Sequence, residues 1–190
     1  MNNSLKQIFR APPVLYTERL VLRKLERYDW LDMYEYSKDR SLTRYLTWEP
    51  HPDSNYTMKY LSYVQSQYRA GKFFDWAVVC GEKMIGTCGF TSIDEEHLRA
   101  EIGYVISPHY QNRGFATEAV NRVLEYGFDV LGLERIEAHY MPENTASRRV
   151  MEKCGMTFEG ILRRFMLVKG RQIDVGVCSI LRSEYMRQRS

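Results

Sequence analysis

The sequence predicts an α/β fold in which one central sheet carries helices on both faces, and three observations support this prediction. Residues 73–80 and 83–90 are two apolar runs joined by a turn, which is typical of a β-hairpin. Residues 100–106 alternate between apolar and small or polar side chains, as a strand does. Apolar residues then recur at helical spacing over 116–131, and the apolar strand 136–140 follows. A strand, a helix and another strand in succession pack a helix against a sheet.

The N-terminal third is predicted to hold one strand and one helix after a loose arm. Residues 1–14 form the arm, and 17–23 have the pattern of the first strand. Asp29 is a candidate N-cap for a helix that ends near Ser37.

A loop and a longer helix are expected next. Residues 44–52 contain two prolines and two aromatic residues, which favours a loop. Ser54 or Asn55 then begins a helix that runs to about Arg69, where Gly71 can end it.

The C-terminal part is predicted to close the sheet. Gly132 ends the long helix after the central strand, and Asn144 is placed to cap a helix that runs to Gly155. Residues 157–169 and 172–181 then pair as a hairpin around Gly170, which completes the sheet.

Length and composition fit one domain spanning residues 1–190. The net charge of +3 would suit a cofactor that contains phosphates, and it is also within the range expected by chance. It does not indicate a protein that binds nucleic acid. No apolar run reaches membrane-spanning length, and residues 1–10 lack the apolar core of a signal peptide. The expected location is the cytoplasm, with no membrane partner.

Cysteine and histidine are placed without any metal-ligand spacing. The four cysteines lie in apolar segments and form no Cys-x-x-Cys pair, so we expect reduced, buried thiols. The four histidines are scattered, and no metal is predicted.

The most informative stretch is Gln111-Asn112-Arg113-Gly114-Phe115-Ala116-Thr117-Glu118. It lies between the strand 100–106 and the helix that follows, so it places free backbone N–H groups at a helix start. Such groups and the positive end of the helix dipole bind anions, most often phosphate. Gly114 allows a close approach of the backbone to a ligand, and Arg113 adds a positive charge.

Taken alone, this motif also fits a plain strand–helix connection with a glycine turn. Two other phosphate motifs are absent. There is no Gly-x-x-x-x-Gly-Lys-Ser/Thr for a P-loop, and the loop has one glycine where the dinucleotide-binding pattern needs three.

The loop and a second motif together resemble the GNAT superfamily of N-acetyltransferases. Gln/Arg-x-x-Gly-x-Gly/Ala is the acetyl-coenzyme A loop of that superfamily. The stretch 142–147, Pro-Glu-Asn-Thr-Ala-Ser, and then 152–156, Glu-Lys-Cys-Gly-Met, resemble its second signature. The resemblance implies a mostly antiparallel sheet of six to seven strands with one splayed parallel pair. It also implies acetyl-CoA as cosubstrate and no metal.

One branch of the family is especially similar. Thr-Glu-Arg-Leu-x-Leu-Arg at 17–23 and Gly-Phe-Ala-Thr-Glu-Ala at 114–119 resemble the RimJ/RimL-like N-acetyltransferases. The acceptor in that branch is the N-terminal alanine or serine of a ribosomal protein. A homodimer is one option that the sequence leaves open.

The resemblance assigns the coenzyme to a set of residues on the central strand, the loop and the second signature. The main chain of the strand pairs with the pantetheine arm, and one of its N–H groups can face the thioester oxygen. The expected cofactor-binding residues are Tyr104, Val105, Ile106, Gln111, Asn112, Arg113, Gly114, Phe115, Ala116, Thr117, Asn144 and Ser147.

Catalysis requires a free amine and a proton for the departing thiolate. Glu101 is the first candidate for the base, acting directly or through water, although a plain surface charge is the other interpretation. Glu159, which resembles a carboxylate of the RimL branch, is a second candidate. An N-terminal α-amino group depends less on a catalytic base than a lysine does, because its pKa is near 7.7–8.0 whereas that of lysine is near 10.4.

The proton donor departs from the usual pattern of the family. Many GNAT enzymes have a tyrosine where this chain has Met151, which cannot donate a proton. Ser147 is the candidate instead, as acid or as pantetheine anchor, although it also fits a first-turn residue of a helix capped by Asn144.

The predicted function is therefore that of an acetyl-CoA-dependent N-acetyltransferase of a protein N-terminus. The alternative acceptor is a small amine such as a polyamine, an antibiotic or an amino sugar. Residues 45–52 and the helix after them should line the acceptor site, where an open groove would favour a peptide and a closed aromatic pocket a small molecule. A module that binds acetyl-CoA without turnover is the third possibility.

Overall fold

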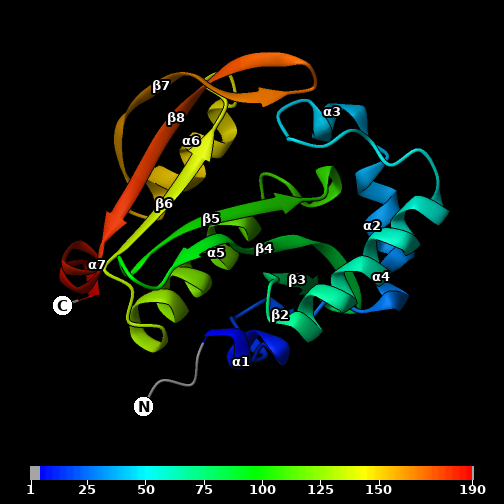
Figure 1. Ribbon diagram of the computed structural model, residues 1–190, viewed down its shortest axis with the longest axis horizontal. Helices are drawn as coiled ribbons and strands as arrows, with labels where there is room; N and C mark the ends of the chain where they lie inside the picture. The colour runs from blue at the N-terminus through cyan, green and yellow to red at the C-terminus, as the bar shows by residue number, and fades with distance from the viewer. Residues whose placement is uncertain (1–4, 190) are drawn as a thin grey trace.

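The computed structural model describes residues 5–189, which build an eight-stranded sheet in the order β1-β2-β3-β4-β5-β6-β8-β7 (Figure 1). Every neighbouring pair is antiparallel except β5 and β6. The strands are β1 (Leu15–Tyr16), β2 (Val21–Arg23), β3 (Phe74–Cys80), β4 (Lys83–Asp94), β5 (Arg99–Ile106), β6 (Arg135–Tyr140), β7 (Thr157–Val168) and β8 (Arg171–Leu181).

Helices cover both faces of this sheet, as the sequence predicts. A 3-10 turn, Arg27–Asp29, precedes α2 directly, a π-helical turn, Tyr126–Val130, continues α5, and a separate 3-10 turn, Pro108–Tyr110, follows β5. The α-helices are α1 (Leu5–Arg10), α2 (Trp30–Ser37), α3 (Arg40–Thr43), α4 (Ser54–Ala70), α5 (Phe115–Glu125), α6 (Thr145–Lys153) and α7 (Arg182–Arg189). Within residues 5–189, no helix is long and apolar enough to cross a membrane.

The predicted fold class is confirmed, and the strand count is higher than the expected six to seven. The predicted first strand, 17–23, is wrong in its first half: only Val21–Arg23 form a strand, and β1, Leu15–Tyr16, lies before the predicted range. Thr17 donates its N–H to the carbonyl of Leu20, and Leu20 returns its N–H to Thr17 Oγ1. This tight turn separates β1 from β2, which produces the additional strand.

The predicted loose arm is partly wrong. Residues 5–10 form α1, and the ring of Phe9 is fully buried against Phe74 and Trp76, with centroid distances of 4.6 and 5.6 Å. Burial of an aromatic ring is worth a few kcal/mol, so this segment is part of the core. Residues 1–4 of the predicted arm lie outside the described residues.

One predicted helix cap is wrong, whereas α4 begins at Ser54 as predicted. Asp29 precedes α2 without capping it, because its carboxylate accepts from the N–H of Glu26 and from both terminal nitrogens of Arg23. Asp53, one residue before the predicted start, caps α4 by accepting from the N–H of Tyr56 at 2.8 Å. The short helix α3 and the C-terminal α7 were not predicted.

The sheet has a hydrophobic core on each face. On one face α5 and α6 pack over the central strands around Trp76, Ile102 and Val120. On the other face α2 and α4 pack over β2 to β4 around Leu61 and Tyr68. The ends of β5 and β6 lie between these layers.

The parallel pair separates along its length. Pairing between β5 and β6 is limited to Arg99 with Arg135, Ala100 with Ile136 and Glu101 with Glu137. Beyond Glu101 the two strands diverge, as Figure 1 shows, while β5 stays paired with β4 as far as Ile106. The backbone of residues 103–106 is therefore unpaired on one edge, where an extended ligand could add as a strand.

Candidate active site

Two cavities meet where β5 and β6 separate. The loop cavity, about 480 Å³, lies against residues 111–117 and α6. The aromatic cavity, about 510 Å³, lies against α2, α4, the sheet and the β7–β8 hairpin. Six residues line both cavities: Tyr45, Leu46, Tyr104, Val105, Asn144 and Ser147. A reaction between a ligand in each cavity would take place at these six residues.

The loop before α5 presents its backbone to the loop cavity. Asn112 and Gly114 have positive φ values of 59° and 82°, and Gly114 occupies the N-cap position of α5. Gln111 folds back and donates from Nε2 to the carbonyl of Ile106 at 2.9 Å. The first N–H groups of α5 have no acceptor within the helix, so they point to the cavity as an anion site.

Most of the predicted cofactor-binding residues line the loop cavity. They are Tyr104, Val105, Ile106, Gln111, Asn112, Gly114, Phe115, Ala116, Thr117, Asn144 and Ser147. Arg113 is the exception, because its guanidinium lies over the rings of Tyr110 and Phe115, at 5.6 and 5.1 Å. The cations that do line this cavity are Arg149 and Lys153, whereas Arg148 pairs with Glu152.

A clamp from the N-terminal segment holds the loop in place. Glu118, in the first turn of α5, accepts from Thr17 Oγ1 at 2.6 Å and from the N–H and Nε of Arg19 at 2.9 and 2.7 Å. Arg19 also donates to the carbonyl of Arg113 at 3.0 Å, and its guanidinium lies 4.5 Å over the ring of Phe115. These hydrogen bonds hold the pKa of Glu118 below its ordinary value although burial opposes this.

Ser147 lies at the junction of the two cavities beside a second hydroxyl group. Asn144 caps α6 by accepting from the N–H of Ser147 at 3.1 Å, which fixes the first turn of the helix. Tyr104, on β5, donates to the carbonyl of Ser147 at 2.9 Å, and its Oη lies 3.0 Å from Ser147 Oγ. Burial raises the pKa of Tyr104, so its hydroxyl stays protonated and can donate. Met151 is buried in the core.

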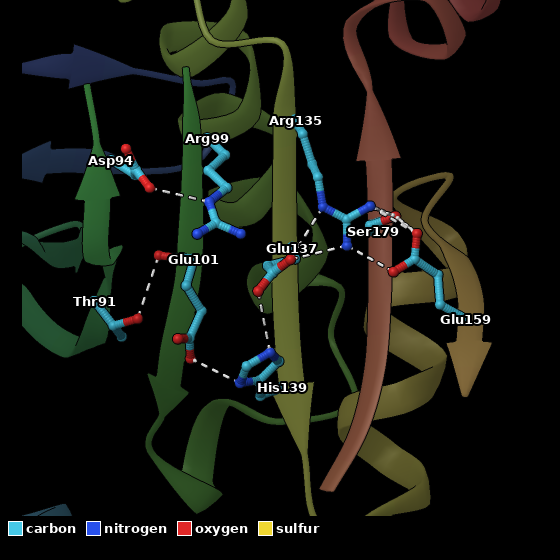
Figure 2. A network of polar contacts seen from close by, with 9 residues as sticks. All are labelled: Thr91, Asp94, Arg99, Glu101, Arg135, Glu137, His139, Glu159 and Ser179. Carbon is cyan, nitrogen blue, oxygen red and sulfur yellow. Dashed lines mark hydrogen bonds and ion pairs between the residues drawn. The ribbon is translucent and has the colours of Figure 1, made fainter. Parts of the chain in front are cut away.

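Glu101 belongs to a polar network that crosses from β5 to β8 (Figure 2). His139 on β6 lies between two carboxylates, with Nδ1 at 3.5 Å from Glu101 Oε1 and Nε2 at 3.3 Å from Glu137 Oε1. Arg135 continues the network, donating to Glu137 and, at 2.7 and 2.6 Å, to Glu159. Glu101 and His139 both line the aromatic cavity.

Glu159 is placed differently from Glu101. It lines neither cavity, and the Arg135 guanidinium and the Ser179 hydroxyl hold its pKa at about 2 against the penalty of burial. A carboxylate with so low a pKa is a weak base. Of the two predicted bases, Glu101 therefore lines a cavity and Glu159 does not.

The aromatic cavity takes its walls from the predicted acceptor segments. Residues 45–48, His51 and the start of α4 line it, as the sequence analysis expects. The ring of His51 lies between Trp48 and Tyr56, and its Nδ1 is 2.8 Å from Thr57 Oγ1. Burial lowers the pKa of His51, so this wall is uncharged at neutral pH.

Sequence reasoning missed three features of the site. Asp75 on β3 lines the aromatic cavity, His139 faces Glu101, and the Tyr104 side chain reaches Ser147. No short motif marks Asp75. The alternation of 135–140 could have placed His139 on the face of Glu101, because paired residues of parallel strands share a face.

Comparison with known proteins identifies the family. The family profile described as "Acetyltransferase (GNAT) domain" matches residues 19–157. The uncharacterized N-acetyltransferase p20 of Bacillus licheniformis is 39% identical over 173 residues, which are 90% of this chain and 97% of that protein. The spermidine N(1)-acetyltransferase of Vibrio cholerae serotype O1 is 32% identical over 171 residues, 90% of this chain and 97% of the relative.

Solved structures agree with this. A GNAT-family acetyltransferase from Bacillus anthracis superposes with a TM-score of 0.80 at 31% identity, covering 90% of this chain and 99% of that one. The spermidine N-acetyltransferase from Vibrio cholerae in complex with CoA and spermine gives a TM-score of 0.75 at 29% identity, covering 90% and 99%. With its splayed strand pair and its loop before α5, this chain belongs to the GNAT family of acetyl-CoA-dependent N-acetyltransferases.

Proposed function

We propose that this acetyltransferase acts on a small primary amine bound in the aromatic cavity. The observation that carries the proposal is the closure of this cavity on one side. Lys169, between β7 and β8, donates from Nζ to the carbonyl of Thr43 at the end of α3, at 2.7 Å. This bond joins the hairpin to the segment that bears Tyr45 and Trp48, and both line the cavity. A cavity that is lined by aromatic residues and closed on one side suits a small molecule better than a polypeptide.

The alternative acceptor, the N-terminal alanine or serine of a ribosomal protein, has less support. The sequence motifs that resemble the RimJ/RimL branch contain Thr17, Arg19 and Glu118, and their contacts with one another explain them as a structural clamp. A solved structure from Vibrio cholerae named for ribosomal-protein-serine acetylation is 20% identical to this chain, which is a likeness of fold. Relatives named as spermidine acetyltransferases are 32% and 29% identical over about 90% of the chain.

We assign the coenzyme to the loop cavity. Its pyrophosphate would be held by the free N–H groups of residues 114–117, and its pantetheine arm by the main chain of Tyr104, Val105 and Ile106. Arg149 and Lys153 supply positive charge at the same cavity. Acetyl-CoA supplies an acetyl group activated as a thioester. We also propose that residues 1–190 act as one acetyltransferase domain, since one sheet includes all the described strands.

Glu101 and the pair of Ser147 and Tyr104 would handle the two protons of the reaction. An alkylamine with a pKa near 10 is almost entirely protonated at neutral pH, so it needs a base more than an α-amino group does. Glu101 would accept that proton at the junction of the cavities. Ser147 Oγ would donate to the departing thiolate, with Tyr104 hydrogen-bonded to it at 3.0 Å. The Tyr104 hydroxyl compensates for the missing tyrosine at Met151.

The test is release of coenzyme A thiol from acetyl-CoA with a panel of acceptors. The panel holds small mono- and diamines and peptides with N-terminal Ala, Ser, Met or blocked ends. We expect turnover of small amines and a fall of about 100-fold in Glu101→Gln. Glu96→Gln, an exposed residue in the turn after β4, is the control and should leave the rate unchanged.

Each other outcome supports a different function. Turnover of free Ala or Ser peptides alone would replace the small amine by a protein N-terminus. Tight binding of coenzyme A, measured by calorimetry, with no turnover of any acceptor would favour a binding module.

A further inference from the structure

The aromatic cavity contains a second carboxylate, and no cation pairs with it. Asp75 is the second residue of β3 and lines the cavity. It accepts a hydrogen bond from the N–H of Trp76 at 3.0 Å and another from the side chain of Thr87. Among residues 5–189 no lysine, arginine or histidine forms an ion pair with it. Its side chain keeps some exposure towards the cavity, but burial raises its pKa to about 7.

An unpaired carboxylate in this position is costly to the fold. An asparagine would accept the same two hydrogen bonds without the penalty of burying a charge. Groups with this kind of perturbation gather where a ligand supplies the missing partner. The partner that satisfies a carboxylate is a cation with N–H donors.

The surroundings of Asp75 favour a cationic ligand over other partners. Tyr36 from α2 and Tyr60 from α4 stand beside it, and burial raises the pKa of both, so both stay neutral. Tyr68, also on α4, donates its hydroxyl to the carbonyl of Asp75. Lys72 lines the same cavity but is exposed. The aromatic rings can contact a cation through their faces.

Two glycines, Gly89 and Gly103, form the cavity surface between Asp75 and the junction of the cavities. Asp75 pairs with Gly89 on β4, and Gly89 pairs with Gly103 on β5. A Cβ added at Gly89 would collide with the backbone of Phe74 and Asp75, and one at Gly103 with Thr91. Two strand spacings, roughly 10 Å, therefore separate the backbone of Asp75 from that of β5, where Glu101 lies two residues from Gly103.

We propose that the acceptor carries a second cationic group and that Asp75 binds it while the reacting amine lies at Glu101. The ligand class is a diamine whose two nitrogens are joined by a chain of several carbon atoms, lying over Gly89 and Gly103 between the aromatic rings. This inference rests on the proposed function, since it names the substrate of the same site. Asp75 is a specificity residue: it contacts the substrate far from the reacting atoms.

Matched amines test the proposal with the whole chain. The probes are 1,3-diaminopropane and 1,5-diaminopentane, each compared with the monoamine of equal length, by thiol release in the wild type, Asp75→Asn and Glu96→Gln. The wild type should prefer a diamine to its monoamine by about 30-fold or more in kcat/KM. Asp75→Asn should remove that preference by raising KM for the diamine. Glu96, an exposed residue in the turn after β4 and outside the cavity lining, controls for the loss of one charge.

A pH series supplies a readout that needs no variant. Ionisation of Asp75 near pH 7 creates the charge that binds the distal ammonium. KM for the diamine should fall as pH rises from 6 to 8. KM for the monoamine should fall less, because only deprotonation of its amine contributes to it. Equal kcat/KM for diamines and monoamines in the wild type would overturn the inference. Equal losses for both in Asp75→Asn would overturn it as well.

Failure of the inference and failure of the proposed function give different results. If monoamines and diamines are turned over with equal kcat/KM, the proposed function is supported and the role of Asp75 is ruled out. If no amine is turned over, the proposed function falls. Calorimetric binding of 1,5-diaminopentane to the complex with coenzyme A then decides the Asp75 site, with loss of binding in Asp75→Asn as the expected result and unchanged binding as the contrary one.

Discussion

The two cavities of this enzyme are built in different ways. The anion-binding part of the loop cavity is one continuous segment, residues 111–117, which offers backbone N–H groups, and β5 and α6 complete the cavity. The aromatic cavity is assembled from side chains of α2, α4, the segment 45–51 and six strands. The first is a property of local backbone conformation, while the second exists only after distant segments pack. Recognition of a constant cosubstrate can therefore be separated from recognition of a variable acceptor.

The largest expected effect is on the loop cavity alone. Gly114→Val places a β-branched side chain at φ 82° and 3.3 Å from Arg19 Nη2, which distorts the N–H groups at the start of α5. We expect the affinity for coenzyme A to fall about 300-fold, as for the loss of two hydrogen bonds to a charged group. Calorimetry measures it. Gly170→Val at the β7–β8 turn, φ 76°, has the same backbone strain and should bind normally. Normal binding by both variants would place the coenzyme elsewhere.

The junction of the cavities gives the next effect. Ser147→Ala should lower kcat about 100-fold, with little change in KM for acetyl-CoA, because the hydroxyl acts when the thiolate departs. Tyr104→Phe should lower kcat by a smaller factor, since it removes the hydrogen bond that orients Ser147. Steady-state kinetics separate this from an anchoring role. A raised KM for acetyl-CoA with an unchanged kcat would make Ser147 a pantetheine contact only.

A smaller effect is expected on the acceptor side. His139→Gln removes the ring that lies between Glu101 and Glu137, so Glu101 loses its fixed position. We expect kcat to fall about tenfold while coenzyme affinity stays unchanged. His97→Gln is the matched control, because His97 contacts the carboxylate of Asp94 outside both cavities. Equal rates in the two variants would remove His139 from the site.

The smallest effect tests whether Glu159 is structural. Its pKa is lowered to about 2, so it contributes stability above its ordinary value of 4.5 and loses this contribution as the pH falls towards 2. Glu159→Gln should cost about 1 kcal/mol at pH 7, after allowance for solvent screening, and the difference should shrink in acid. Urea unfolding at pH 7 and pH 3 measures it. Glu152→Gln, which breaks an exposed ion pair of α6, should change stability by a few tenths of a kcal/mol at most. A large loss of kcat in Glu159→Gln would restore it as a candidate base.

The same contrast explains what the sequence could predict. The hairpin at Gly81, the cap at Asn144 and the loop before α5 depend on residues within a few positions of one another, and each was placed correctly. Asp29 is the exception among the local predictions, because two partners close to it in sequence, Arg23 and the N–H of Glu26, occupy the carboxylate that was expected to cap α2. A cap prediction therefore fails where other nearby groups compete for the same side chain.

The candidate site divides in the same way. The sequence could identify Glu101 as a candidate base from its place on the central strand, but it could not show that Glu159 is the weaker candidate. That depends on the ion pair of Glu159 with Arg135, which forms only because β6 pairs with β8. Asp75 was missed for a related reason. Its environment comes from α2, α4 and β4, and although α4 and β4 flank β3 in the chain, the side chains that face Asp75 are Tyr36, Tyr60 and Thr87, which only the packing of these elements brings to it.

The clamp on the loop has a consequence for the order of folding. Thr17 and Glu118 are 101 residues apart, so their hydrogen bond forms only after most of the chain has folded. A motif that is local in sequence thus reaches its binding geometry late. During synthesis from the N-terminus, a nascent chain that ends before residue 118 lacks the carboxylate that fixes Arg19 and, through it, the carbonyl of Arg113. Binding of coenzyme A would then show that the hydrogen bond between Thr17 and Glu118 has formed.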